Sequence, residues 1–154
     1  MAGRIETRLA ELGITLPSPT VPIANYVPYV IAGNLVVISG QIPMRDGRVI
    51  FTGKISQGNS INDGQDAAQL CFINLLVHLK AALGSLDRVK RVVRLGGFIA
   101  APPDFTAHAQ VMNGASDLAV AVFGDAGRHA RSTIGVPSLP ANALVEVEGM
   151  FEID

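Results

Sequence analysis

The chain has 154 residues, of which 16% are charged and 5% aromatic, and its formal net charge is −1. This length suits one domain with its own hydrophobic core, spanning residues 1–154. The weak charge and scarce aromatics argue against a nucleic-acid groove, which is usually basic and interleaved with aromatic residues. The single cysteine, Cys71, excludes an internal disulfide. It lies in an apolar run, so we expect a small buried side chain and a reducing, cytoplasmic setting.

The mean hydropathy is high, at +0.37. The uncharged stretch 12–44 is interrupted by prolines and lacks the ~18 consecutive apolar residues of a membrane span. The first residues form an amphipathic Arg/Glu segment rather than a signal peptide, so we expect a soluble protein. So little charge would be unusual for a soluble monomer. We therefore expect a closed homo-oligomer, with helices on one sheet face and sister subunits over much of the other.

The first half of the chain alternates turn signals with apolar runs. Residues 3–13 predict a short helix, and a proline-rich connector follows at 16–22. Two strands, 26–31 and 35–39, flank a Gly33-Asn34 turn and predict a hairpin. A shorter strand is expected at 48–52, after the Asp46-Gly47 turn.

The second half carries two long helices. The first begins at an Asn62 or Asp63 cap and ends at Gly84, and the second covers 104–123. Between them lies a strand, 89–100, in which Gly96-Gly97 suggests a bulge or a tight packing contact. After a leading helix, the order β-β-β-α-β-α-β-β predicts an α+β domain, with a mixed sheet and two helices on one face.

The last segment carries the best candidates for chemistry. Arg131 lies early in it, a Leu139-Pro140 turn follows, and an alternating strand brings in Glu146 and Glu148. As a hairpin, this segment would place Arg131 and a glutamate at the same end of a sheet. A guanidinium binds a carboxylate with two parallel hydrogen bonds, and a nearby carboxylate can activate water. A surface ion pair between Arg131 and Glu146 is an equally good interpretation.

Other site types find no support in the sequence. His78, His108 and His129 are spread out without metal-ligand spacing, and we expect His78 at the surface or the edge of the core. Neither a phosphate-binding glycine motif nor a G-x-S-x-G elbow occurs. We therefore expect no metal site.

Three motifs together resemble one known family. They are N-Y-V-P-Y-V-I-A-G-N-L-V-V-I-S-G-Q-I-P (25–43), L-D-R-V-K-R-V (86–92) and A-R-S-T-I-G-V-P-S-L-P-A-N-A-L-V-E-V-E (130–148). In this order they resemble the reactive-intermediate deaminases (Rid, YjgF-type), also called L-PSP endoribonucleases. The similar region is the core, 23–154, and residues 1–15 form an extra N-terminal helix.

The resemblance implies a chorismate-mutase-like α+β fold and a homotrimer with ligand clefts between subunits. It implies hydrolysis of 2-imino or 2-enamino acids to 2-keto acids and ammonia, without a cofactor. Arg131 matches the carboxylate-binding arginine and Glu146 the water-positioning acid. Tyr26, Gly40 and Asn113 match residues that line the cleft, and Thr133 stands where many members have cysteine.

Two rival functions are also compatible with the sequence. One is a non-catalytic trimer that binds small carboxylates or partner proteins in the same clefts. The other is ribonuclease action, as the older family name implies, although the weak charge and scarce aromatics weigh against RNA binding. We expect the partners to be imino, enamino or keto acids and further copies of the chain, with neither a membrane nor nucleic acid.

Overall fold

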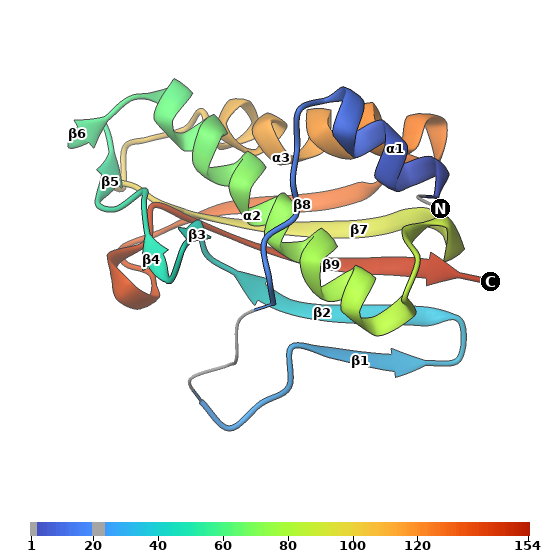
Figure 1. The fold of residues 1–154 in the computed structure, drawn as a ribbon. Helices are drawn as coiled ribbons and strands as arrows, with labels where there is room; N and C mark the ends of the chain where they lie inside the picture. The colour runs from blue at the N-terminus through green and yellow to red at the C-terminus, as the bar shows by residue number, and fades with distance from the viewer. Residues whose placement is uncertain (1–2, 20–23) are drawn as a thin grey trace.

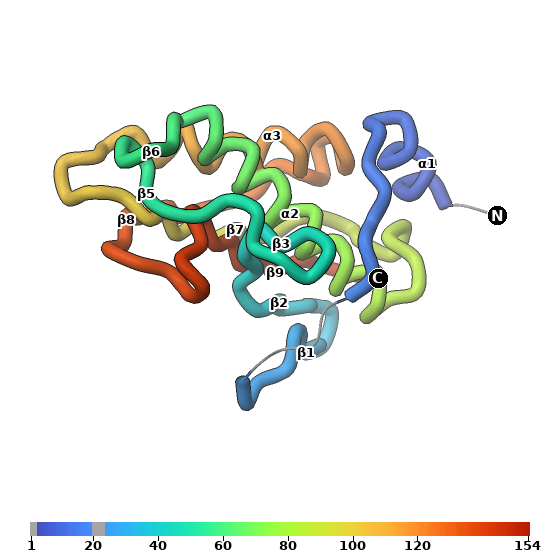
Figure 2. The backbone as a smooth tube through the Cα atoms, turned by 60° about the vertical axis from the view of Figure 1, so that its left-hand side comes forward, coloured from blue at the N-terminus to red at the C-terminus, as the bar shows by residue number. Residues whose placement is uncertain are grey.

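The computed structural model describes residues 3–19 and 24–154. A five-stranded mixed sheet has the order β1-β2-β9-β7-β8, and the three α-helices lie on one of its faces (Figure 1). The predicted α+β architecture is therefore confirmed. The tube view shows the same layers, with β1 at the free edge of the sheet (Figure 2).

The helices agree closely with the predicted periodicity. They are α1 (Arg4–Glu11), α2 (Ile61–Leu83) and α3 (His108–Phe123), with 3-10 turns at Leu86–Arg88, Gly124–Gly127 and Pro140–Asn142. The predicted cap of α2 is wrong by two or three residues, because Ser60 is the N-cap. The Ser60 hydroxyl accepts a hydrogen bond from the backbone amide of Asp63. In return, the Asp63 carboxylate accepts a hydrogen bond from the backbone amide of Ser60. This reciprocal capping satisfies two backbone donors at the start of the helix.

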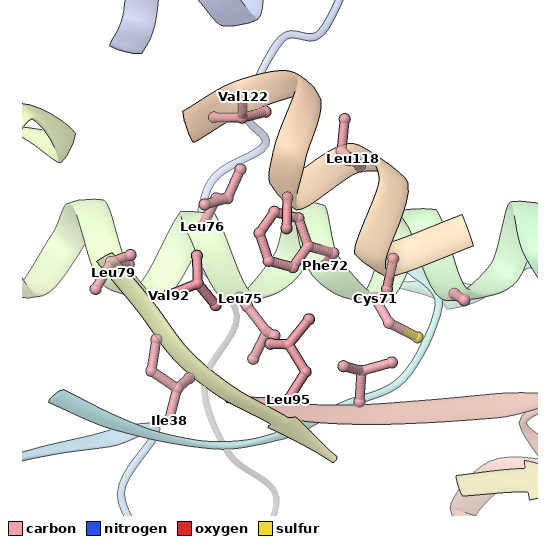
Figure 3. Packing of buried hydrophobic residues seen from close by; sticks show 14 of the residues in the cluster. Ile38, Cys71, Phe72, Leu75, Leu76, Leu79, Val92, Leu95, Leu118 and Val122 are labelled. Carbon is pink, nitrogen blue, oxygen red and sulfur yellow. The ribbon is translucent and has the colours of Figure 1, made fainter. Parts of the chain in front are cut away.

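The core forms where α2 and α3 pack on the sheet. Figure 3 shows Phe72 and Leu75 of α2 between Leu118 of α3 and Leu95 of β7. Cys71 is fully buried, as expected, and burial raises the pKa of its thiol well above the usual value. By length and composition α2 could cross a membrane, but its apolar character is also that of a helix packed in this core.

The long strands match the predictions better than the short ones do. The bounds are β1 (Tyr29–Ala32), β2 (Leu35–Gln41), β7 (Val89–Ala100), β8 (Ala130–Val136) and β9 (Val145–Ile153). The strand expected at 48–52 is replaced by two-residue pairs: β3 (Met44–Arg45) with β4 (Arg48–Val49), and β5 (Lys54–Ile55) with β6 (Gly58–Asn59). The Gly33-Asn34 hairpin between β1 and β2 is confirmed.

The register of β7 explains its two glycines. The irregularities in its pairing fall at 89–91 and 92–94, not at Gly96-Gly97. A side chain at Gly97 would collide with the Met112 sulfur of α3, and one at Gly96 with the Glu148 side chain. Of the two predicted roles, tight packing is therefore the one the structure has.

The predicted hairpin of the last two strands is wrong. β7 lies between β8 and β9, pairing parallel with β8 and antiparallel with β9. The turn at 140–142 therefore crosses over a strand instead of joining neighbours. Sequence periodicity does not reveal this, because a strand with apolar residues on both faces can accept a partner on either side.

The N-terminal helix is held by a residue far along the chain. The Asp87 carboxylate accepts the backbone amides of Arg4 and Ile5, at 2.9 and 2.8 Å, and these bonds lower its pKa. Ile5 and Leu9 enter the core, as the predicted helical face requires. The proline-rich connector expected at 16–22 falls partly outside the described residues.

Candidate functional site

Arg131 extends from β8 toward α3. Its Nη1 donates to the Ser116 hydroxyl at 3.0 Å and its Nη2 to the Ala109 carbonyl at 3.3 Å. The ion pairs formed among residues 3–19 and 24–154 do not include Arg131. The half-buried guanidinium is thus held by two neutral acceptors, and no described carboxylate pairs with its positive charge. A guanidinium in this situation is suited to bind an anion.

Ser116 and His129 form a small network around this arginine. His129 Nδ1 lies 2.6 Å from the Gly127 carbonyl, which can only accept, so this nitrogen carries the proton. His129 Nε2 is then the acceptor for the Ser116 hydroxyl, at 2.8 Å. The serine oxygen is left to accept from Arg131. The chain of contacts therefore fixes the direction in which the guanidinium points.

Thr133 and Asn113 border the same region. Thr133 follows Arg131 by two residues on β8 and so shares its face of the strand. Asn113 lies on the face of α3 that carries Ala109 and Ser116, by the four- and three-residue spacing of a helix. The buried Thr133 hydroxyl has no hydrogen-bond partner within the described part of the chain. An unsatisfied buried hydroxyl costs about 1–3 kcal/mol.

Replacing Thr133 by valine should therefore stabilise the isolated chain, because valine has nearly the same shape without the hydroxyl. We expect a gain in the free energy of unfolding of about 1 kcal/mol, measured by urea denaturation without ligand. If the hydroxyl donates to a bound ligand, the same variant should bind that ligand more weakly. A loss of stability without ligand would mean that the hydroxyl has a partner that the structure does not contain.

The predicted residues Tyr26, Gly40 and Glu146 meet elsewhere, in the wall of a cavity of about 790 Å³. The cavity lies between α2, the end of β2, the β3–β4 pair and the turn before β9. A Cβ on Gly40 would approach Oε1 of Glu146 to 2.6 Å. A side chain at Gly40 would push the Glu146 carboxylate aside, so glycine leaves room for this carboxylate where β2 passes it.

The Glu146 carboxylate is held in an unfavourable environment. Burial raises its pKa first, and the negative charge of neighbouring Glu148 raises it further. No hydrogen bond joins its oxygens to another described residue. A partly buried carboxylate with a raised pKa can accept a proton from water, which is the task of a general base.

Within one chain these two groups lie on opposite faces of the sheet. Arg131 is in register with buried Leu95 and contacts α3, so it lies on the helix-covered face. Glu146 lies on the other face of β9, because its neighbours Val145 and Val147 are buried in the core. Neither a hairpin site nor a surface ion pair between Arg131 and Glu146 therefore forms within one chain.

Sequence reasoning missed three polar residues near these groups. Ser116 carries no motif, and only the packing of α3 on β8 reveals its role. Asn74 donates to the carbonyls of Ile42 and Met44, both at 3.1 Å, and ties the cavity wall to α2. His78 is 4% exposed and lines the cavity beside the core, so of the two expected positions the core edge is the one that the structure has. Polar residues at i and i+4 on an apolar helix were the available signal.

The comparisons with known proteins cover almost the whole chain. A family model described as "YjgF/chorismate mutase-like, putative endoribonuclease" matches residues 6–153. Protein TCP17 of Trypanosoma cruzi is 44% identical over 154 residues, covering 99% of this chain and 96% of that protein. A 2-iminobutanoate/2-iminopropanoate deaminase of Dermatophagoides farinae is 34% identical over 141 residues, covering 92% and 95%.

A solved structure supports the same assignment. The crystal structure of a protein of unknown function from Agrobacterium tumefaciens has 48% identity and a TM-score of 0.91, covering 97% of this chain and 92% of that one. Since the family model extends over nearly the full length and the relatives align end to end, this chain belongs to the YjgF/chorismate mutase-like family.

Proposed function

We propose that the protein hydrolyses 2-imino or 2-enamino acids to 2-keto acids and ammonia, in clefts formed between subunits of a homotrimer. The observation that carries this proposal is that the two candidate groups, Arg131 and Glu146, lie on opposite faces of the sheet. An arginine that forms no ion pair within the described residues lies on the helix-covered side of the sheet. A carboxylate with a raised pKa lies on the other side, at a cavity that continues past the end of β2 to α2. Each group is half of a site for a small carboxylate that reacts with water. The similarity to a 2-iminobutanoate/2-iminopropanoate deaminase supports the same chemistry.

The two halves have complementary roles in the reaction. Arg131 of one subunit binds the substrate carboxylate with two hydrogen bonds and places the C=N carbon near a water molecule. The electrophile is the protonated imine. As a water oxygen bonds to its carbon, Glu146 of the neighbouring subunit accepts a proton from the water and the C=N electrons move to nitrogen, which gives a neutral carbinolamine. The proton on Glu146 then passes to that nitrogen, ammonia leaves as the hydroxyl oxygen forms the carbonyl group, and the hydroxyl proton is released to water. Positioning supplies much of the rate, so no side-chain nucleophile is needed.

The open face of the sheet suits the subunit contacts that this mechanism needs. Val30, Val37 and Ile134 lie on the face away from the helices and are 53%, 40% and 52% exposed. Apolar side chains together on a sheet face are typical of a surface that another chain covers. The partner that fits is a second copy of this chain, because that copy completes the divided site.

Sedimentation equilibrium should therefore give three times the 16.1 kDa mass of the chain. Replacing Val37 by aspartate puts a charge on the buried face of the trimer and should release monomers at micromolar concentration. Lys80→Glu, on an exposed position of α2, is the matched control and should leave the trimer intact. A wild-type monomer at these concentrations would contradict the shared cleft.

The Ser116–His129 network gives a further prediction. Ser116→Ala removes the acceptor of Arg131 Nη1, so the guanidinium becomes less well oriented. We expect KM for an imino acid to rise about threefold to tenfold, with a smaller change in kcat, because the loss is one hydrogen bond. Steady-state kinetics measure both constants. Asp117→Asn, at an exposed position next to Ser116 on α3, should change neither.

The activity itself is tested by generating 2-iminobutanoate with an amino-acid oxidase and following its decay with and without the purified protein. Faster decay that requires Arg131 establishes the deaminase. Binding of 2-ketobutyrate without faster decay would identify the alternative, a trimer that binds small carboxylates. Absence of both effects would exclude the two functions together.

A further inference from the structure

Apart from Arg131 and Glu146, the most unusual polar residue is His78. It lies on α2 with 4% of its surface exposed and lines the same cavity as Glu146. None of the hydrogen bonds between side chains of the described residues involves its ring. Neither ring nitrogen is among the buried side-chain atoms that lack a partner in the described part of the chain, so the nitrogens reach the water of the cavity. The ring faces a space that can hold a ligand.

Asn74, the polar neighbour of His78 on α2, already forms hydrogen bonds within the chain. Asn74 lies one turn earlier on the same face of α2, and its amide nitrogen donates to the carbonyls of Ile42 and Met44. These bonds hold the segment after β2 against α2 and so give the cavity a fixed wall. Of the two polar side chains that α2 contributes to the cavity, His78 is the one that forms no hydrogen bond with the described residues and can bind a ligand.

The rest of the cavity favours a mostly apolar ligand. Val77, Ile42, Met44 and Val49 contribute apolar side chains to the wall, and its volume of about 790 Å³ lies in the range of pockets for drug-sized molecules. The charged lining residues Arg45 and Asp46 are exposed, so they lie at the mouth. A two- or three-carbon imino acid would fill only a small part of this space.

We propose that the His78 wall is a specificity subsite, which binds the neutral hydrogen-bonding end of a bulky substrate side chain, such as a phenol hydroxyl. The inference rests on the proposed function: the carboxylate and reacting carbon lie near Glu146, and the side chain extends along the apolar wall to His78. The substrate class is therefore imino acids with a long or aromatic side chain that ends in a hydroxyl or an amide.

The state of His78 explains why the end group is neutral. Burial lowers the pKa of the ring, so the imidazole is uncharged at neutral pH and offers one donor and one acceptor. A hydroxyl can satisfy either of them without bringing a charge into the pocket. A charged end group would have to be stripped of water beside a neutral ring.

The sharpest test compares two ligands that differ by one hydroxyl. 4-Hydroxyphenylpyruvate and phenylpyruvate are the keto acids that the imines of tyrosine and phenylalanine would yield. We expect isothermal titration calorimetry on the full-length protein to show about tenfold tighter binding of the hydroxylated ligand, since one buried hydrogen bond is gained. His78→Phe should abolish this preference while leaving phenylpyruvate binding unchanged.

Two further variants keep the test decisive. His78→Gln retains a donor and an acceptor and should keep part of the preference, whereas Lys80→Gln, two residues along on the exposed surface, should keep all of it. Thermal unfolding of His78→Phe should show no loss of stability, because the ring it replaces has no partner. A wild-type protein without the preference, or a preference that survives in His78→Phe, would overturn the subsite.

The failure of this inference is distinguishable from that of the proposed function. Turnover of 2-iminobutanoate without any preference between the two aromatic ligands removes the subsite and leaves the deaminase. The expected preference in binding, without turnover of any imino acid, supports the subsite and removes the deaminase.

Discussion

Replacing Arg131 by alanine should lower kcat/KM for hydrolysis of 2-iminobutanoate by about 10²–10³-fold. The guanidinium forms two charge-assisted hydrogen bonds with the substrate carboxylate, and losing them costs both affinity and the placement of the C=N carbon. Arg131→Lys should recover only a small part, because an ammonium cannot present two parallel donors. The measurement is the decay of the imine produced by an amino-acid oxidase, followed over a range of substrate concentrations.

The matched control is Arg128→Ala, three residues earlier. Arg128 is exposed and lies 3.6 Å from Asp125 in a surface ion pair, so its loss should change the rate by less than about twofold. Equal rates for wild type and Arg131→Ala would show that the carboxylate binds elsewhere. Circular dichroism should show that both variants remain folded, because the two hydrogen bonds of Arg131 end on neutral acceptors and their loss leaves no charge unpaired.

Glu146→Gln should reduce turnover by about 10²–10⁴-fold, the contribution typical of a general base. Binding of 2-ketobutyrate should change little, because glutamine has the same shape and the carboxylate of the ligand is bound by Arg131. The variant should also unfold at a higher temperature, since it removes a partly buried negative charge next to Glu148. Calorimetry and thermal unfolding measure these two effects, and unchanged turnover would remove Glu146 from the mechanism.

The raised pKa of Glu146 gives activity and stability opposite responses to pH. The carboxylate must be unprotonated to accept a proton, so kcat/KM should rise with pH through a pKa above the usual value of 4.5 and then level off. The folded state holds the Glu146 proton more tightly than the unfolded state does. The contribution of Glu146 to stability is therefore greatest below pH 4.5 and is lost as the pH rises through the folded-state pKa.

Glu148→Gln separates the two causes of that raised pKa. It removes the second of them, the neighbouring charge, while burial remains. The midpoint of the pH–activity profile should therefore move toward the usual pKa of a glutamate without reaching it. A midpoint that stays in place would mean that Glu148 does not interact with the catalytic carboxylate.

The sequence by itself determined the helices, the long strands and the residues that can carry the chemistry. Helical and strand periodicity, and the glycine turn before β2, are local properties of the chain, so α2 and β7 emerge close to their true bounds. The similarity of residues 130–148 to a known family pointed to Arg131 and Glu146. The cap at Ser60 was missed by two or three residues, because several residues nearby can cap a helix.

Only the tertiary structure decided where the candidate groups lie. The insertion of β7 between β8 and β9 separates Arg131 from Glu146, and the alternation of strand residues places them on opposite faces. No local pattern encodes which strands become neighbours, because pairing depends on contacts between segments that are distant in the chain. For the same reason, Ser116 has its role only because α3 packs on β8. His78 has its role only because segments that precede and follow α2 in the chain form one cavity beside it.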